Sequence, residues 1–196
     1  RKAKFVANPG CYPTSILLPL IPLIKKKIIK NQHIIIDSKS GVSGAGKKLE
    51  IKNLFSEINE NFYSYGLKKH KHFVEIDQEI SKLGNNTFTF IPSLVPVTRG
   101  LQSTIYLEKN KSVNFYKNII KDYYKNEPFI QILDKKCPSF SDVKYTNNLL
   151  LNIFEDYKKK RIIIISCIDN LVKGAAGQAI QNMNLMYAFN EKESLI

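Results

Sequence analysis

The chain has 196 residues, of which 43% are hydrophobic and 11% aromatic, so it can bury one ordinary globular core and is not a disordered chain. No apolar run approaches the ~18 residues that a membrane span requires, and the three cysteines include no CxxC pair that would indicate a disulfide framework. The N-terminus lacks the pattern of a secretory signal peptide. We therefore expect a cytoplasmic protein with no membrane partner.

The formal net charge is +13, from 30 Lys and Arg residues against 17 Asp and Glu residues. These charges fall in predicted turns and element ends, and they do not alternate with aromatic residues as in a groove for single-stranded nucleic acid. The chain is enriched in lysine, asparagine and isoleucine along its whole length, and this general bias in composition also accounts for the positive charge. We therefore predict no nucleic-acid partner, although a basic surface would attract small anionic substrates.

The first predicted element is a tight turn followed by a buried helix. Residues 8–14, NPGCYPT, combine a proline–glycine turn with a second proline that suits a first helical turn, and apolar residues over 16–21 continue the helix. The thiol of Cys11 would then lie at the positive end of the helix dipole, which stabilises the thiolate that a covalent nucleophile requires. The alternative is that Cys11 is a small buried hydrophobe at a turn.

A strand of β-branched residues is predicted over 33–38, and it leads into a loop of small residues at 40–46, SGVSGAG. The backbone N–H groups of this loop form a plausible anion nest, although such loops are common. Residues 48–63 are polar and are predicted to be helical or irregular.

Apolar residues spaced by three and four positions predict a helix over 72–83. The sequence before it, KKHKH, places His70 and His72 near its first turn. On such a helix His72, Glu75 and Glu79 share one face, so a histidine and a glutamate could serve as a general base and its orienting partner; a solvated helix end is the alternative. We predict no metal site, because no cysteine or carboxylate cluster completes a tetrahedral set with the two histidines.

The rest of the chain alternates strands and helices. Strands are predicted over 87–92, 101–107, 129–133 and 142–145 and as a hairpin over 149–155 and 161–168, and helices over 112–124 and 174–189. The last helix opens with GAAG, where free N–H groups could meet a polar ligand or small side chains could permit close packing. The sum predicts an α+β fold, with a mixed or mainly antiparallel sheet and helices on one face. No GxGxxG motif follows an early strand, so the Rossmann phosphate fingerprint is absent.

Five segments together resemble the family of N-acetyl-γ-glutamyl-phosphate reductases, the NADP-dependent enzymes of arginine biosynthesis. In chain order they are NPGCYPT (8–14), SGVSGAGKK (40–48), KKHKHFVEIDQEI (68–80), PSLVPVTRGL (92–101) and IDNLVKGAAGQAIQNMNL (168–185). The resemblance covers nearly the whole chain, and the last segment is long enough to be highly specific. The related aspartate-semialdehyde dehydrogenases do not carry the first and last segments in this form.

The resemblance implies a fold like that of glyceraldehyde-3-phosphate dehydrogenase. In such enzymes a Rossmann domain binds the cofactor, an α+β domain after the reactive cysteine supplies the substrate site and subunit contacts, and a final helix returns to the Rossmann domain. By this correspondence, residues 1–170 form the catalytic and oligomerisation domain and residues 171–196 the returning helix, while the N-terminal NADP-binding domain is absent from this chain. A homo-oligomer, either a dimer or a tetramer, is implied.

The implied reaction reduces N-acetyl-L-glutamyl 5-phosphate to N-acetyl-L-glutamate 5-semialdehyde, with NADP(H) as cofactor. Cys11 would attack the acyl phosphate, and the resulting thioester would accept a hydride. For the acid–base role His72 is the first choice and His70 the second, and Glu75 would orient the imidazole or bind substrate. The backbone N–H of Cys11 would stabilise the oxyanion.

The remaining implied contacts are with substrate from Asn8 and Arg99, and with cofactor from Ser43, Gly44, Gly46 and Asn182. Two positions depart from the family pattern. Ser93 stands where members often have histidine, which leaves the acid–base role to the histidine pair. Lys47 and Lys48 stand where the family usually has arginine, which keeps the charge but loses the bidentate fork.

Two alternatives remain open at this point. A sister reductase that acts on the one-carbon-longer aminoadipyl phosphate of lysine biosynthesis would share all of this chemistry. An inactive, truncated oligomerisation fragment would share the sequence without the turnover.

Overall fold

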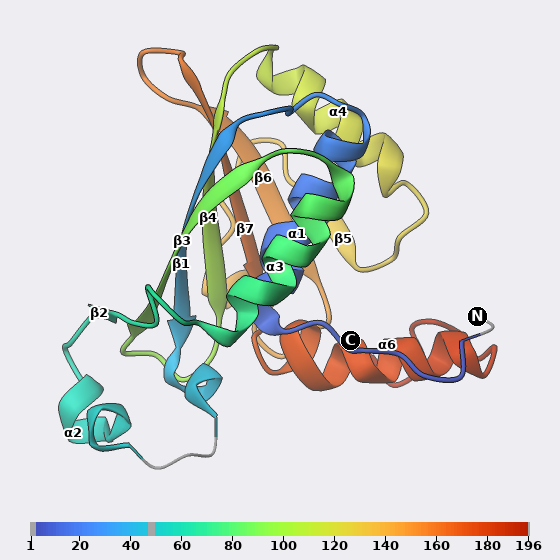
Figure 1. Cartoon of the computed structure of the whole chain (residues 1–196). Helices are drawn as coiled ribbons and strands as arrows, with labels where there is room; N and C mark the ends of the chain where they lie inside the picture. The colour runs from blue at the N-terminus through green and yellow to red at the C-terminus, as the bar shows by residue number, and fades with distance from the viewer. Residues whose placement is uncertain (1–2, 47–49, 196) are drawn as a thin grey trace.

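A seven-stranded mixed sheet forms the centre of the molecule, with three helices packed on one of its faces (Figure 1). The structure, a computed structural model, describes residues 3–46 and 50–195 of the chain. Lys47 and Lys48, which depart from the family pattern, lie outside the described residues.

The strands are β1 (His33–Gly41), β2 (Tyr63–Ser64), β3 (Thr87–Val95), β4 (Leu101–Glu108), β5 (Ile130–Ile132), β6 (Leu149–Glu155) and β7 (Arg161–Ile168). The α-helices are α1 (Cys11–Lys25), α2 (Phe55–Ile58), α3 (Lys71–Leu83), α4 (Val113–Tyr123), α5 (Phe140–Val143) and α6 (Gly177–Met186). Short turns of other helical types occupy Val42–Ala45, Ile51–Asn53 and Val172–Ala176. The strand order is β2-β3-β1-β4-β7-β6-β5, and only the β1–β3 and β5–β6 pairs are parallel among the described strands, so the predicted mixed sheet is confirmed.

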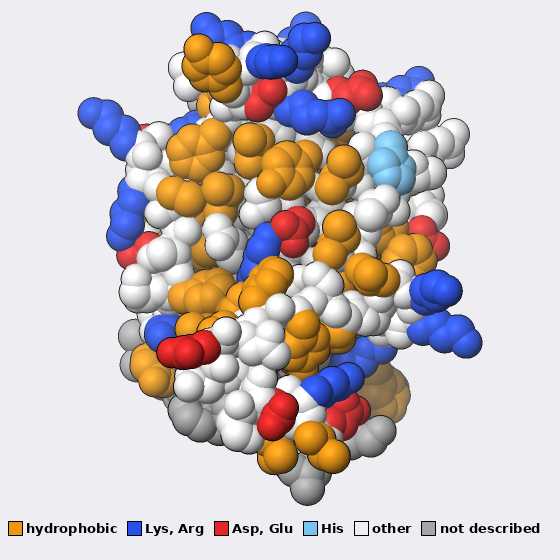
Figure 2. Space-filling model, turned by 90° about the vertical axis from the view of Figure 1, so that its left-hand side faces the viewer, with side chains coloured by type: hydrophobic (Ala, Val, Ile, Leu, Met, Phe, Trp, Pro, Cys, Tyr) orange, Lys and Arg blue, Asp and Glu red, His pale blue; other side chains and the backbone are white. Residues whose placement is uncertain are grey.

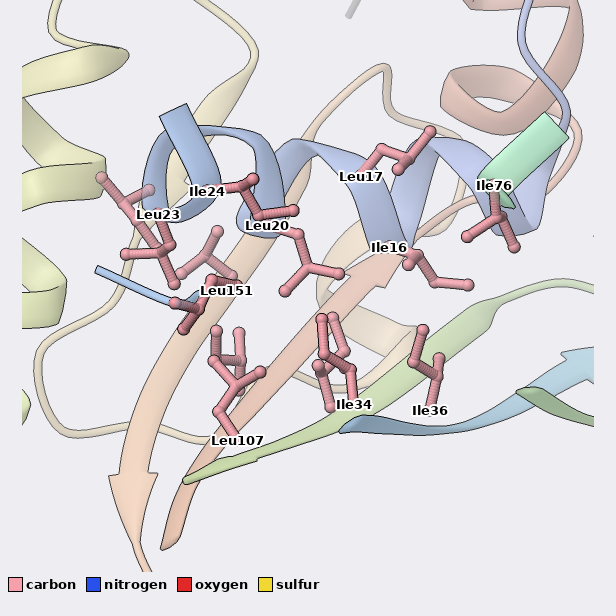
Figure 3. Close-up of a cluster of buried hydrophobic side chains, with 14 of the residues drawn as sticks. Ile16, Leu17, Leu20, Leu23, Ile24, Ile34, Ile36, Ile76, Leu107 and Leu151 are labelled. Carbon is pink, nitrogen blue, oxygen red and sulfur yellow. The ribbon is translucent and has the colours of Figure 1, made fainter. Parts of the chain in front are cut away.

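The core forms where α1 lies along the middle of the sheet. Ile16, Leu20 and Leu23 of α1 are fully buried, and they point toward inward-facing side chains such as Ile34 and Ile36 of β1 (Figure 3). The alternation of buried and partly exposed residues along β1 supplies this apolar face. The burial of these side chains against the sheet fixes the position of α1, and of its first residue Cys11, relative to the central strands.

The strand predicted over 142–145 is wrong, because the short helix α5 forms there instead. Asp142 Oδ2 accepts hydrogen bonds from the backbone N–H and the hydroxyl of Ser139, at 2.9 and 2.7 Å. This capping box satisfies the free end of a helical turn and favours helix over strand. This short helix packs against β6 and β7 on the face opposite α1, whereas the longer helices α1, α3 and α4 lie together on one face, as predicted.

The helix predicted over 174–189 is two elements. A π-helical turn comes first, with backbone hydrogen bonds from Gly174 to Asp169 and from Ala176 to Leu171, each 3.0 Å long. The regular helix α6 then ends at Met186, earlier than predicted. Within residues 3–46 and 50–195, none of the helices has the length and apolar character needed to cross a bilayer.

The face of the sheet opposite α1, α3 and α4 is largely uncovered, and a band of hydrophobic side chains runs across it (Figure 2). Cross-strand pairing places four partly exposed apolar residues in one row: Phe154, Ile163, Tyr106 and Ile35. An ion pair between Asp37 and Lys39 lies beside this row on β1. We call these six residues the outer face.

We expect Leu20→Ala to lower the free energy of unfolding of this chain by about 2–5 kcal/mol, because it leaves a cavity under a fully buried side chain. Urea unfolding followed by circular dichroism measures the change. Leu67→Ala is the matched control, because the Leu67 side chain is 63% exposed and its loss should change stability by less than about 0.5 kcal/mol. Equal effects of the two substitutions would contradict the described core.

Candidate active site

The proline–glycine turn at residues 8–10, which we call the reactive turn, precedes α1, as the sequence predicts. Gly10 is the N-cap of α1 and Cys11 is its first residue, and Gly10, which has no side chain, supplies no side-chain cap. The backbone N–H groups of Cys11 and Tyr12 act on the Cys11 thiol and favour its ionised form. This is the electrostatic contribution of a helix N-terminus.

Burial nevertheless outweighs the helix end at this thiol. It raises the pKa of Cys11 to about 11, against the two backbone N–H groups and the charge of Lys71, and the carboxylate of Glu75 adds to the rise. The prediction of an ionised thiol is therefore wrong for this chain on its own. Desolvation destabilises the thiolate more than the helix N-terminus stabilises it. At neutral pH a base must therefore remove the proton.

Two neutral histidines lie beside the turn. His70 caps α3, and its Nδ1 accepts a hydrogen bond from the backbone N–H of His72 at 3.1 Å. Burial, repulsion from His70 when both rings are protonated, and the charge of Lys71 lower the pKa of His72 to about 4. Burial, followed by the charge of Lys71, lowers the pKa of His70. Both imidazoles are therefore uncharged at neutral pH, which is the form that can accept a proton.

His72 is pressed against the reactive turn itself. A Cβ atom added to Gly10 would lie only 2.4 Å from His72 Nε2, so only glycine lets the imidazole come this close. The other ring nitrogen, Nδ1, is buried and has no hydrogen-bond partner among the described residues. A buried, unpaired ring nitrogen next to a cysteine-bearing turn is typical of a group with a chemical role.

Glu75 holds the turn rather than the imidazole. Its Oε1 accepts a hydrogen bond from the backbone N–H of Gly10 at 2.9 Å. No hydrogen bond between Glu75 and His72 occurs in the described structure. Glu79, predicted to share the same face of the helix, instead pairs with Lys82 on the surface.

A cavity of about 310 Å³ opens beside this turn. It brings the histidine pair together with the loop predicted to hold cofactor. Its lining residues are Tyr12, Gly44, Ala45, Tyr65, Gly66, Lys69, His70, Lys71 and His72. The two lysines among them, Lys69 and Lys71, supply positive charge, which suits an anionic substrate. The hydroxyls of Tyr12 and Tyr65, which sequence analysis did not single out, lie 3.1 Å apart at this site.

The small-residue loop is more ordered than predicted, because its first two residues belong to β1 and the next four form a 3-10 turn. A Cβ atom at Gly44 would lie 2.6 Å from Ser40 Oγ, so the close approach requires glycine. Gly46 has a φ of 83°, a left-handed conformation that favours glycine. The Ser43 hydroxyl donates to the carbonyl of Thr98 at 2.5 Å.

Arg99 is paired within the chain. Its Nη1 donates to Asp169 Oδ2 at 3.2 Å, and its guanidinium lies 4.9 Å from the centre of the Tyr145 ring. Arg99 is not among the residues that line the cavity beside the cysteine. Sequence analysis missed Asp169, and its only signal was a carboxylate at the end of an apolar strand.

The structure brings Asn8 and Asn182 together. Asn182 Nδ2 donates to Asn8 Oδ1 at 2.9 Å, and Asn8 Nδ2 donates to the carbonyl of Ala175 at 3.2 Å. A Cβ atom at Gly174 would lie 2.6 Å from Cys11 Cβ, so at this glycine the small side chain serves close packing. The segment that follows β7 therefore forms a second wall of the reactive turn.

Residues 11–170 match the family model described as the dimerisation domain of semialdehyde dehydrogenase. A curated relative named N-acetyl-gamma-glutamyl-phosphate reductase, from Caldicellulosiruptor saccharolyticus, is 50% identical over 100% of this chain and 58% of its own length. A relative from Arabidopsis thaliana, named probable N-acetyl-gamma-glutamyl-phosphate reductase, chloroplastic, is 47% identical over 100% of this chain and 50% of its own length. The chain thus spans little more than half the length of these relatives.

Solved structures show the same fold. Aspartate semialdehyde dehydrogenase II from Vibrio cholerae matches with a TM-score of 0.71 and 19% identity, over 93% of this chain and 62% of that structure. A probable aspartate-semialdehyde dehydrogenase from Pseudomonas aeruginosa matches with a TM-score of 0.74 and 14% identity, over 95% of this chain and 64% of that structure. The predicted α+β fold class is confirmed.

We expect the alkylation rate of Cys11 by iodoacetamide to rise with pH until about pH 11, because the thiolate is the reacting form and burial disfavours it. Peptide mass spectrometry at each pH separates Cys11 from the exposed Cys137, which serves as the internal control. A Cys11 rate that levels off below about pH 8 would show a thiol that ionises more readily than an unperturbed cysteine, whose pKa is about 8.5, and would contradict the effect of burial.

Proposed function

Because the chain belongs to the family of semialdehyde dehydrogenase dimerisation domains, we propose that it is the catalytic part of an N-acetyl-γ-glutamyl-phosphate reductase. The proposed reaction converts N-acetyl-L-glutamyl 5-phosphate to N-acetyl-L-glutamate 5-semialdehyde and phosphate through a thioester on Cys11. The observation that carries this proposal is the position of Cys11 at the start of α1, with His72 pressed against the preceding residue.

His72 begins the reaction by accepting the proton of the Cys11 thiol. It is favoured over His70 for this role, because the His70 Nδ1 already caps α3 while a ring nitrogen of His72 is unpaired. The thiolate attacks the acyl carbon, the backbone N–H of Cys11 stabilises the oxyanion, and the bond to phosphate breaks. After reduction the sulfur leaves the carbon as thiolate and regains its proton from the imidazolium.

NADPH, when bound, supplies the hydride that reduces the thioester. The described residues fit the nicotinamide end of such a cofactor, because Gly44 lies at the cavity beside the cysteine and Gly46 follows it. We propose that these glycines and Ser43 approach the cofactor and that Asn182 contacts the nicotinamide amide. The cofactor phosphates would be held by an N-terminal Rossmann domain, to which residues 171–196 would return.

We propose that Asn8, Glu75 and Arg99 support the substrate in different ways. Glu75 acts through the N–H of Gly10, and Asn8 lies next to the π-helical turn. Arg99 is held by Asp169 through Nη1, and its remaining N–H groups are the proposed partners of a substrate carboxylate or phosphate.

Two alternatives remain as outcomes. The sister aminoadipyl-phosphate reductase would acylate Cys11 faster from the longer acyl phosphate than from N-acetylglutamyl phosphate. A truncated oligomerisation fragment would show no turnover. We propose that the protein is cytoplasmic, because an odd number of cysteines with no CxxC pair is usual for a chain in a reducing compartment.

We also propose that two copies associate through the outer face. The row of partly exposed apolar side chains there is continuous over four strands, and large uncovered apolar patches mark interaction sites. The description of the matching family model as a dimerisation domain supports this proposal.

Intact-mass spectrometry of this chain after exposure to N-acetyl-L-glutamyl 5-phosphate tests the acylation step without the cofactor. We expect a thioester adduct that is lost in Cys11→Ser and retained in Cys137→Ser. His72→Asn should slow adduct formation about a hundredfold or more, because it removes the general base. His33→Asn is the control, because His33 bonds Thr87 and Thr89 at the far end of β1. An adduct that persists in Cys11→Ser would overturn the proposed nucleophile.

Sedimentation velocity tests the association. We expect Ile163→Lys to weaken it at least about tenfold, because a charge would be buried in the apolar row. Val74→Lys is the control, because Val74 lies on α3 with its side chain 70% exposed. If both variants associate like the wild type, the contact lies elsewhere.

A further inference from the structure

Asn170 joins two loops that lie far apart in the sequence. Its Oδ1 accepts a hydrogen bond from the backbone N–H of Gly100 at 2.8 Å, and its Nδ2 donates to the Ser43 hydroxyl at 2.9 Å. The residue is only 2% exposed, so water does not substitute for these partners. A buried amide thus ties the turn after β3 to the loop after β1.

The polarity of this contact is fully determined. The Ser43 hydroxyl donates its only proton to the Thr98 carbonyl, so it can only accept a hydrogen bond from Asn170. The Gly100 N–H can only donate. A side chain at position 170 must therefore present an acceptor on one side and a donor on the other, which asparagine does and aspartate does not.

The same contact reaches Gly44. A Cβ atom at Gly44 would lie 3.6 Å from Asn170 Nδ2, so the amide also packs under the next residue of the loop. The Ser43 backbone N–H donates to the Thr98 carbonyl at 3.2 Å, which closes the arrangement. Asn170 is therefore the buried support of the part of the loop that lines the cavity beside Cys11.

The preceding residue, Asp169, supports the segment that packs against Cys11. Its Oδ1 accepts from the backbone N–H groups of Leu171 and Val172 at 2.8 and 3.1 Å, and its carbonyl accepts from Gly174 at 3.0 Å. Gly174 in turn packs against Cys11 Cβ. Two adjacent residues at the end of β7 thus fix the nucleophile side and the loop side of one site.

We propose that Asn170 is a positioning residue for cofactor, which sets the Ser43–Gly44 loop at the correct distance from Cys11. The inference rests on the proposed function, because it takes this loop to approach the nicotinamide. It assigns Asn170 a role in cofactor binding and not in acylation, since its contacts run to the loop and to Gly100 and not to the cysteine.

Steady-state kinetics of the full-length protein that contains this chain test the proposal. Asn170→Ala and Ser43→Ala should each raise the KM for NADPH about tenfold, because both remove the buried hydrogen bond that joins the two side chains. The effect of the double variant should be smaller than the sum of the two single effects, because both single variants remove the Asn170–Ser43 hydrogen bond. The KM for acyl phosphate and the acylation rate of Cys11 should stay within about twofold of the wild type.

Asn152→Ala is the matched control. Asn152 is also a fully buried asparagine that uses both ends of its amide, with Nδ2 donating to the Lys136 carbonyl at 2.8 Å and Oδ1 accepting from the Ile153 N–H at 2.7 Å. It should lower the melting temperature without changing the KM for NADPH. If Asn170→Ala behaves in the same way, or raises both KM values equally, Asn170 is merely structural and the inference is wrong.

Hydrogen exchange on this chain separates the two proposals. Asn170→Ala should accelerate exchange of the Ser43 amide about tenfold, and Asn152→Ala should leave it unchanged. A wild-type full-length protein without NADPH-dependent turnover would overturn the proposed function, even with that exchange result in hand. Turnover together with an unchanged Ser43 exchange rate in Asn170→Ala would overturn the inference alone.

Discussion

The close packing of backbone around the turn at Gly10 and Cys11 is the constraint on which the rest of the site depends. His72 occupies the space that a side chain at Gly10 would need, and the Cys11 Cβ occupies the space that one at Gly174 would need. The helix that follows is locked by the burial of its apolar face on the sheet. Because protein interiors are close-packed, neither wall can move without displacing the cysteine.

The same packing explains the electrostatics of the thiol. Contacts that position Cys11 also remove water from it, and desolvation acts against the charged form. A neutral imidazole is held beside the turn, where burial lowers its pKa; this keeps it unprotonated at neutral pH but also makes it a weaker base. The close packing around Cys11 therefore both holds the cysteine in place and makes a separate base necessary.

Local sequence patterns predicted most of the fold. The start of α1 at the NPGCYPT motif, the helix that begins after His70 and the hairpin of β6 and β7 all follow from residues close together in the chain. The failure at α5 is instructive, because the Ser139–Asp142 capping box is also local but lies in a stretch that alternates like a strand. At this position the hydrogen bonds between Ser139 and Asp142 favour a helical turn over the strand that the apolar pattern predicts.

The site was less predictable, because its interactions join distant segments. Arg99 and Asp169 are 70 positions apart, as are Gly100 and Asn170, and no periodicity links them. The raised pKa of Cys11 was missed for the same reason, because the groups that shield the thiol from water come from α1, α3 and the segment after β7. Sequence indicated candidate residues for the chemistry, and tertiary packing decided their partners.

The Asp37–Lys39 pair on the outer face has a consequence for specificity. Both charges are partly shielded from solvent within a hydrophobic surrounding, and neither can be dehydrated cheaply unless it keeps its counter-charge. Any apolar surface could cover the neighbouring side chains, but only one with matching polarity at this point could cover the pair. The ion pair thus disfavours non-specific association with other apolar surfaces, while the neighbouring apolar side chains still contribute binding affinity.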